Sequence, residues 1–147
     1  MNTASRHLVH AAAFVALAGC TSNEPTQPGD PASESIVDVG IGQPFQLRPG
    51  TTAQLPGGLL VGFKGVSSDS RCPSDVVCVW QGDASVRINA TVGRMAWTPF
   101  DLHTGINPKD ASFRDWQIRL VAVNPHPRST APIPPGDYTI TLEVTRH

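Results

Sequence analysis

Two cysteines near the middle of the chain have the spacing that points most directly to chemistry. Cys72 and Cys78 are separated by five residues. Such a pair can form a disulfide, act as a redox couple, or supply two ligands to a metal ion. Redox couples commonly have the shorter C-x-x-C spacing, and a structural zinc site needs a second pair of Cys or His ligands. No second pair lies nearby in the sequence, so we expect a short-range disulfide.

Charged and aromatic residues surround this pair. Asp69 and Arg71 precede it, Asp75 lies inside the loop, and Trp80 follows it. Asp69 and Arg71 are placed to pair with each other or to bind backbone groups of the loop. Aspartates can also bind a hard cation, although Asp is common in turns because its side chain binds local N–H groups. We take Asp69, Arg71, Asp75 and Trp80 as candidate binding residues and expect no metal.

Four aromatic residues flank a less regular stretch, residues 98–114: Trp97, Phe100, Phe113 and Trp116. Such a group either closes one end of the core or forms an exposed patch that grips a partner or a glycan. The second alternative has a physical basis, because Trp is enriched at binding hot spots. We therefore add Trp97 and Trp116 to the candidate binding residues and keep both interpretations open.

Motifs of several enzyme classes are missing. The sequence has no G-x-S-x-G nucleophile elbow, phosphate loop, dinucleotide glycine fingerprint or H-E-x-x-H motif. His103, His126 and His147 are far apart and lack the spacing of metal ligands. We expect no catalytic residue, no cofactor and no enzymatic activity. A metal-dependent hydrolase is the least favoured alternative, since it would require folding to gather these groups into one pocket.

Alternating apolar and polar residues predict the strands that position these side chains. In residues 84–92 and 138–145, apolar side chains occupy every second position. This period is typical of a strand with one buried and one exposed face. Residues 116–123 alternate more loosely, and the face that we expect to be buried holds Ile118, Leu120 and Ala122.

Shorter strands complete the predicted fold. They are expected at residues 45–47, 51–55, 59–66 and 76–80, with Cys78 and Trp80 on one face of the last. Pro- and Gly-rich turns separate them, and residues 98–114 are expected to form a long irregular loop. About seven short strands with regular turns predict an all-β fold, either an antiparallel sandwich or a small barrel.

The N-terminus has the features of an exported protein. Arg6 lies in a short polar head, and a mainly apolar stretch follows at residues 8–18. This stretch is shorter than the roughly 20 residues of a membrane-spanning helix but suits a signal peptide. Leu17-Ala18-Gly19-Cys20 resembles the lipobox of bacterial lipoproteins. The resemblance implies cleavage before Cys20 and attachment of a diacylglyceryl group to its thiol.

These features divide the chain into three parts. Residues 1–19 are the predicted signal peptide, residues 20–35 a lipidated cysteine and disordered tether, and residues 36–147 a single β-sandwich domain. The tether contains three prolines and no large apolar side chain, so it cannot bury enough surface to fold. Stable anchoring by several acyl chains implies membrane attachment without spanning. Thr21 after the cysteine favours the outer membrane, facing the periplasm, by similarity to enteric lipoproteins.

The cysteine segment also carries a resemblance. Its pattern D-S-R-C-P, four residues, then C-x-W-x-G, resembles a family of small secreted bacterial proteins. The resemblance extends over residues 45–144, including the Asn124-Pro125-His126-Pro127 segment and the closing strand after Asp137. It implies a shared fold and an extracytoplasmic location, and no established activity comes with it.

Charge excludes one class of partner. Removing residues 1–19 takes away Arg6 and leaves 10 basic and 12 acidic residues, a net charge near −2. No basic stripe is present, so we do not expect a nucleic-acid partner. The favoured function is a membrane-anchored binding module for an envelope protein or glycan, with an inhibitor of an envelope or foreign enzyme as one version. A passive structural lipoprotein is the alternative from a different class.

Overall fold

The computed structural model describes residues 35–147, so the predicted signal peptide, Cys20 and the tether before Ser35 lie outside the described residues. The strands of this part are β1 (Ser35–Asp38), β2 (Phe45–Leu47), β3 (Thr51–Leu55), β4 (Leu59–Asp69), β5 (Ala84–Val92), β6 (Thr98–His103), β7 (Asp110–Phe113), β8 (Trp116–Asn124) and β9 (Thr139–Arg146). A 3₁₀ turn, η1 (Pro135–Asp137), precedes β9. Within residues 35–147, no helix has the length and apolar character needed to cross a bilayer.

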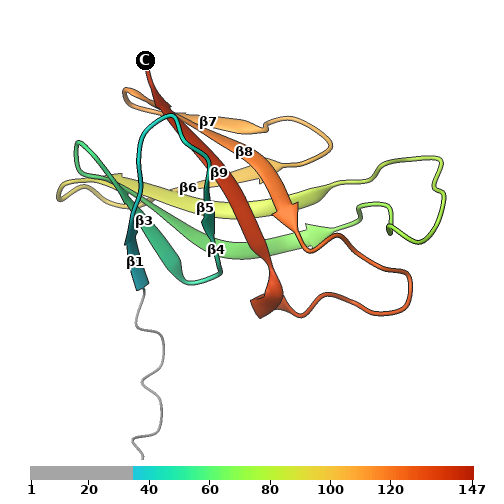
Figure 1. Ribbon diagram of the computed structural model, residues 1–147. Coiled ribbons are helices and arrows are strands. Elements are labelled where there is room, and N and C mark those ends of the chain that lie inside the picture. The colour runs from blue at the N-terminus through green and yellow to red at the C-terminus, as the bar shows by residue number, and fades with distance from the viewer. Residues whose placement is uncertain (1–34) are drawn as a thin grey trace, which may run out of the picture. The chain divides into compact units, whose positions relative to one another are not determined.

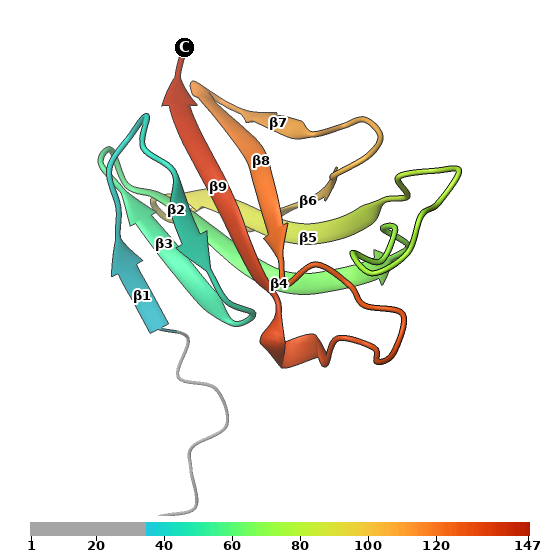
Figure 2. The same cartoon turned by 45° about the vertical axis from the view of Figure 1, so that its right-hand side comes forward.

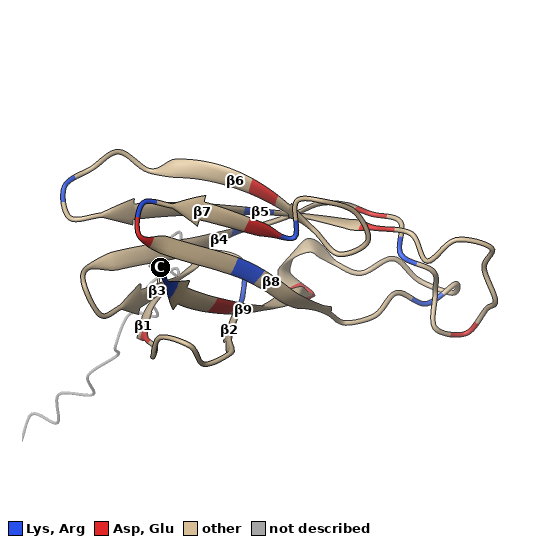
Figure 3. Ribbon diagram, turned by 90° about the horizontal axis from the view of Figure 1, so that it is seen from above, with Lys and Arg blue, Asp and Glu red and all other residues tan. Residues whose placement is uncertain are grey.

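The strands form two sheets. One has five strands in the order β1-β3-β4-β5-β6, and the other has four in the order β2-β9-β8-β7. Neighbouring strands are antiparallel except β1 and β3, which are parallel. The sheets pack as two layers (Figures 1 and 3). The predicted all-β sandwich is confirmed, with nine strands rather than about seven.

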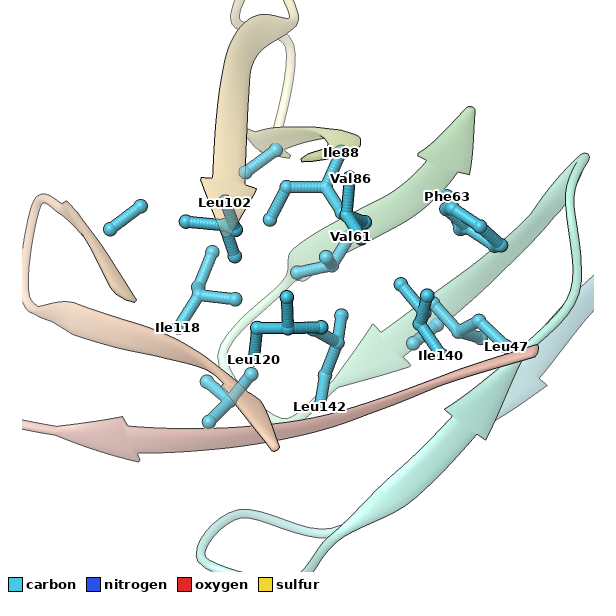
Figure 4. Close-up of a cluster of buried hydrophobic side chains, with 14 of the residues drawn as sticks. Leu47, Val61, Phe63, Val86, Ile88, Leu102, Ile118, Leu120, Ile140 and Leu142 are labelled. Carbon is cyan, nitrogen blue, oxygen red and sulfur yellow. The ribbon is translucent and has the colours of Figure 1, made fainter. Parts of the chain in front are cut away.

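The core lies between the two sheets and follows the predicted alternation. Phe63 from β4 and Ile88 from β5 face Ile140 and Leu142 from β9, and all four side chains are fully buried (Figure 4). Polar residues on alternate positions of these strands point to the outer faces. Burial of apolar surface contributes about 25 cal/mol per Å², so this interior supplies most of the favourable free energy of folding.

β8 departs from the predicted alternation. A β-bulge between Leu120 and Ala122 shifts its register against β9. As a result, Val123 lies in the core and Ala122 is only half-buried. The prediction that Ala122 shares the buried face of Ile118 and Leu120 is therefore wrong, because a bulge inserts one residue into a strand and reverses the faces beyond it.

Two other predicted segments also differ. Residues 76–80 form no strand, since β4 pairs directly with β5 and leaves residues 70–83 as a long connection. Residues 98–114, predicted to be irregular, contain β6 and β7. β6 pairs with β5 at the edge of its sheet. An edge strand tolerates Pro99, whose missing N–H would disrupt a central strand.

Candidate binding site at the disulfide loop

Three connections between strands meet at one end of the sandwich, which we call the cap. They are the β4–β5 connection (residues 70–83), the β6–β7 connection (104–109) and the β8–β9 connection (125–138) (Figure 2). The Ser74 N–H donates to the carbonyl of Pro127 at 2.9 Å, and His126 Nε2 lies at the same distance from the carbonyl of Cys72. The cap lies at the end of the domain away from β1 in all three overall views (Figures 1 to 3).

Arg71 is the buried cation that holds the cap to the second sheet. Its side chain is 7% exposed, and Nε and Nη2 donate to the two oxygens of Asp69 at 2.9 and 2.6 Å. Nη1 donates to the carbonyl of Val123, and Nη2 also donates to that of Pro125 at 2.8 Å. The planar guanidinium presents five N–H donors in a fixed arrangement, so one side chain can bind a carboxylate and two carbonyls together.

Asp69 is held in its ionised form. Burial alone would raise the pKa of Asp69, but the hydrogen bonds and positive charge of Arg71 lower that pKa below its usual value of 3.8. The Tyr138 hydroxyl also donates to Asp69, at 3.2 Å. Burial and the Asp69 charge raise the pKa of Tyr138 above its usual 10.0. The charges of Asp69 and Arg71 therefore balance each other at pH 7. The hydrogen bonds described for the two side chains are all made to groups of the protein itself.

Asp83 organises the other side of the cap. Its carboxylate accepts a hydrogen bond from the Gly105 N–H at 2.7 Å and lies 2.7 Å from His103 Nδ1. Burial opposes ionisation, but the Gly105 and His103 contacts lower the pKa of Asp83 overall. Gly82 has φ +69°, and a Cβ atom there would clash with the backbone of Ser70. These contacts place the β6–β7 connection directly against the base of the disulfide loop.

The disulfide loop is fixed at two further points. Cys72 and Cys78 form the predicted disulfide, with their Cα atoms 5.9 Å apart. Asp75, inside the loop, accepts hydrogen bonds from the Ser129 N–H at 2.9 Å and from its hydroxyl at 2.6 Å. The hydroxyl and N–H of Ser129 lower the pKa of Asp75. Asp69 and Arg71 are therefore brought together, whereas Asp75 binds Ser129 separately, and both sets of contacts position the loop.

The tip of this loop has the opposite character. Four apolar side chains project into solvent there, and we define them as the tip: Val76, Val77, Val79 and Trp80. Val77 and Val79 are as exposed as in an extended chain, at 102% and 96%, and Trp80 is 82% exposed. Residues 76–82 carry no charge. Residues 74–81 of the loop are exposed, and the apolar ones among them form the tip, whereas Arg71 at the base of the loop is buried.

The other two tryptophans lie away from the cap. Trp116 begins β8 at the opposite end, is 3% exposed, and stacks under the Arg146 guanidinium at 4.7 Å. A side chain so deeply buried is unsuited to direct contact with a partner. Trp97 follows β5 at that same end, is 42% exposed, and has the Lys64 ammonium over its ring at 6.0 Å. Trp97 and Trp116 therefore lie at the other end of the domain from Trp80, which is in the cap.

Histidines and acids do not converge on a metal site. Among residues 35–147, no group of three or more His, Cys, Asp or Glu side chains has the arrangement needed to hold a metal ion. His103 contacts Asp83, His126 contacts the Cys72 carbonyl, and His147 is the last residue. In the described residues, these histidines are thus separated from one another and each has a different environment.

Several residues that build the cap escaped prediction. Tyr138, Ser129 and Gly105 reach it from connections that are more than 20 residues away from the cysteines in the sequence. In the sequence, the β8–β9 connection is marked only by turn-forming residues and, through the resemblance, by its Asn124-Pro125-His126-Pro127 segment. Compared with protein-family models, with curated proteins and with solved structures, the chain matches none of them.

Proposed function

We propose that this chain is a lipid-anchored lipoprotein of the bacterial cell envelope whose folded domain is a non-catalytic binding module. The single observation that carries the binding role is the tip, where Val77, Val79 and Trp80 are exposed on a loop that is otherwise held by a disulfide and buried polar contacts. Exposed apolar side chains stabilise the isolated protein little. Grouped on a braced loop, they are typical of a surface that is buried on binding.

The bracing of the loop adds to this argument. A loop that is ordered before binding loses less conformational entropy when a partner is bound. The disulfide, the Asp75–Ser129 hydrogen bonds and the Cys72 N–H bond to Gln81 all restrict the tip before any partner arrives. Trp80 is the side chain that we expect to contribute most to affinity, since Trp is among the residues most enriched at hot spots.

One version of this function is favoured by the shape of the loop. An apolar projection braced by a disulfide fits a concave apolar pocket, and inhibitors of enzymes commonly present such a loop to an active-site cleft. The inhibitor hypothesis therefore places residues 76–80 in the pocket of an envelope or foreign enzyme. A flat glycan surface would offer less contact to this projection.

We also propose that the chain belongs to the family of small secreted bacterial proteins that its cysteine segment resembles. The residues of the D-S-R-C-P and C-x-W-x-G patterns include those with distinct roles in the cap: Asp69 and Arg71 at its base, the two cysteines, Trp80 at the tip and Gly82 in its tight turn. A family defined by these residues would share a braced apolar loop.

The anchor is tested by fractionation of cells that express the full chain. We expect the wild type in the membrane fraction and Cys20→Ala in the soluble fraction. The control is the double variant Cys72→Ser, Cys78→Ser, which should stay membrane-bound because it retains Cys20. Membrane retention of Cys20→Ala without lipid contradicts the anchor.

The binding role is tested by photo-cross-linking in cells. A photoreactive phenylalanine analogue at position 77 should capture a specific envelope protein, and Trp80→Ser should abolish the product. The matched control places the analogue at Val121, an exposed apolar residue on β8. Identical products from positions 77 and 121, or none from position 77, contradict recognition through the tip.

A further inference from the structure

A second feature of the cap is the open edge of β4. β4 pairs with β5 along its whole length to Asp69, opposite Ala84. On the other side, β3 pairs with β4 only between Leu59 and Gly62, and the Gly50 N–H binds the carbonyl of Phe63. No strand of the described chain pairs with that outer edge beyond Phe63. The second half of β4, residues 64–69, therefore pairs with β5 on one side and has no strand neighbour on the other.

A cavity of about 460 Å³ runs beside this edge. Residues 66–69 of β4 all line it, and Tyr138 and residues 127–133 complete most of its wall. Side chains on one face of a strand come from alternate residues. A register shift between Val66 and Ser68 interrupts that alternation in β4. All four lining residues lie beyond the last residue of β4 that pairs with β3, so the cavity borders the part of β4 that has no strand neighbour on that side. We call this cavity the β4 groove.

The walls of the groove are mostly uncharged and are held by polar contacts. Asp69 is neutralised by Arg71, and the Asp75–Ser129 hydrogen bonds fix the facing connection. Ser67, Ser68, Ser129 and Thr130 contribute hydroxyl groups, and Arg128 is the cationic residue of the lining. The single aromatic residue of the lining, Tyr138, is buried, with its hydroxyl bound to Asp69. A sugar ring would find no exposed aromatic platform among these residues.

We infer that the β4 groove binds an extended polypeptide segment of a partner, which adds to the sheet as a short strand along residues 66–69. An open strand edge offers backbone N–H and C=O groups at about 3.3 Å per residue, a repeat that another extended polypeptide matches. The neutral walls and Arg128 favour segments with small neutral or acidic side chains. This inference goes beyond the proposed role of the tip, because the groove is a different surface of the cap.

The geometry of β4 limits the length of such a segment. Register shifts between Phe63 and Gly65 and between Val66 and Ser68 interrupt its pairing with β5. Bulges bend a strand and discourage long edge-to-edge pairing, and they are one of the devices by which proteins protect open edges. An added strand is therefore restricted to a few residues, and the facing wall at residues 127–133 selects one that fits the groove.

The probe is a phage-displayed library of random 12-residue peptides, selected on the full chain purified in detergent. Selected peptides should slow hydrogen exchange of the backbone amides in residues 66–69 at least tenfold, and leave those of β6 unchanged. Ala131→Trp, which fills the groove from its outer wall, should weaken peptide binding at least tenfold. Ala96→Trp, an exposed alanine in the β5–β6 connection, is the matched control and should change binding less than twofold.

The outcomes separate the groove from the tip and from other occupants. Trp80→Ser should leave peptide binding unchanged, so failure of the tip does not affect this test. The inference is overturned if the library yields no peptide that protects residues 66–69. It is also overturned if an N-acetylglucosamine tetramer gives that protection, or if the protection depends on protein concentration without peptide, which would identify a second copy as the occupant. Exchange in the wild type decides the matter even if Ala131→Trp does not fold.

Discussion

The interior between the sheets and the cap distribute polar and apolar residues in opposite ways. Between the sheets, apolar side chains such as Phe63 and Leu142 are fully buried and polar residues face outward. In the cap, Asp69 and Arg71 are buried, whereas Val77 and Trp80 face solvent. The difference separates two regions physically: apolar burial stabilises the interior, whereas polar contacts hold the cap and leave several of its apolar side chains exposed.

The interior and the cap also differ in the interactions that stabilise them. The free energy of apolar burial is non-directional and scales with the area removed from water. A buried ion pair depends on both partners, since removing one leaves an uncompensated charge. The cap should therefore be more sensitive to single polar substitutions than to loss of its apolar side chains. The following predictions compare polar and apolar substitutions in the cap, beginning with the largest expected effect on stability.

Replacing Arg71 should damage the cap most. Arg71→Ala leaves the Asp69 carboxylate buried without its partner and frees the carbonyls of Val123 and Pro125. We expect a loss of about 3–5 kcal/mol in the free energy of unfolding, measured by denaturant titration. Arg87→Ala is the control, because both side chains of the Arg87–Asp101 pair are exposed and solvent screening leaves the pair little effect on stability. If both variants lost the same free energy of unfolding, the buried ion pair of the cap would be no more important for stability than an exposed one.

Removing the disulfide should have the next largest effect. The bridge closes a loop with a sequence separation of 6, and the chain-entropy relation gives about 2 kcal/mol for so short a loop. The double variant Cys72→Ser, Cys78→Ser should unfold at a correspondingly lower denaturant concentration. An unchanged midpoint between oxidised and reduced wild-type protein would show that the polar contacts alone hold the loop.

Acid should weaken the cap through Asp69. The folded protein lowers the pKa of this carboxyl, so its contribution to stability is present above the usual value of 3.8 and is lost as pH falls through the lower, folded value. Unfolding free energy measured from pH 5 to pH 2 should fall less steeply for Asp69→Asn than for the wild type. Identical slopes would mean that other carboxyl groups account for the acid sensitivity.

Substitutions in the tip should have the smallest effect on stability. Val77→Ser and Trp80→Ser alter side chains that contact little of the folded protein, so we expect changes within about 0.5 kcal/mol of the wild type. The same variants should lose the cross-linked partner proposed above. A large destabilisation by Trp80→Ser would indicate that the indole packs on the cap and would weaken its role in recognition.

The sequence predicted the sheets better than it predicted the cap. Period-two alternation located β5 and β9 because one face of each strand is buried and the other is not. The bulge in β8 and the two strands within residues 98–114 were missed, since neither a register shift nor a short edge strand leaves a long alternating pattern. The disulfide followed from cysteine spacing, and it is present.

The cap was only partly predictable for a physical reason. Asp69 and Arg71 are two residues apart, so their pairing could be proposed from the sequence alone. Their long-range partners, the carbonyls of Val123 and Pro125, are backbone groups that every residue has and that no sequence pattern marks. Exposure of Val77 and Trp80 runs against the usual burial of apolar residues, so a strand was predicted where the chain forms a projecting loop.

The absence of charge from residues 76–82 has a kinetic consequence for any encounter made by the tip. Charged surfaces accelerate association and make its rate fall with ionic strength, whereas uncharged ones associate at about 10⁵–10⁶ M⁻¹ s⁻¹. A partner that docks on the tip should thus arrive at an unsteered rate that added salt barely changes. Selectivity among competing partners would then reside in how slowly the correct complex dissociates.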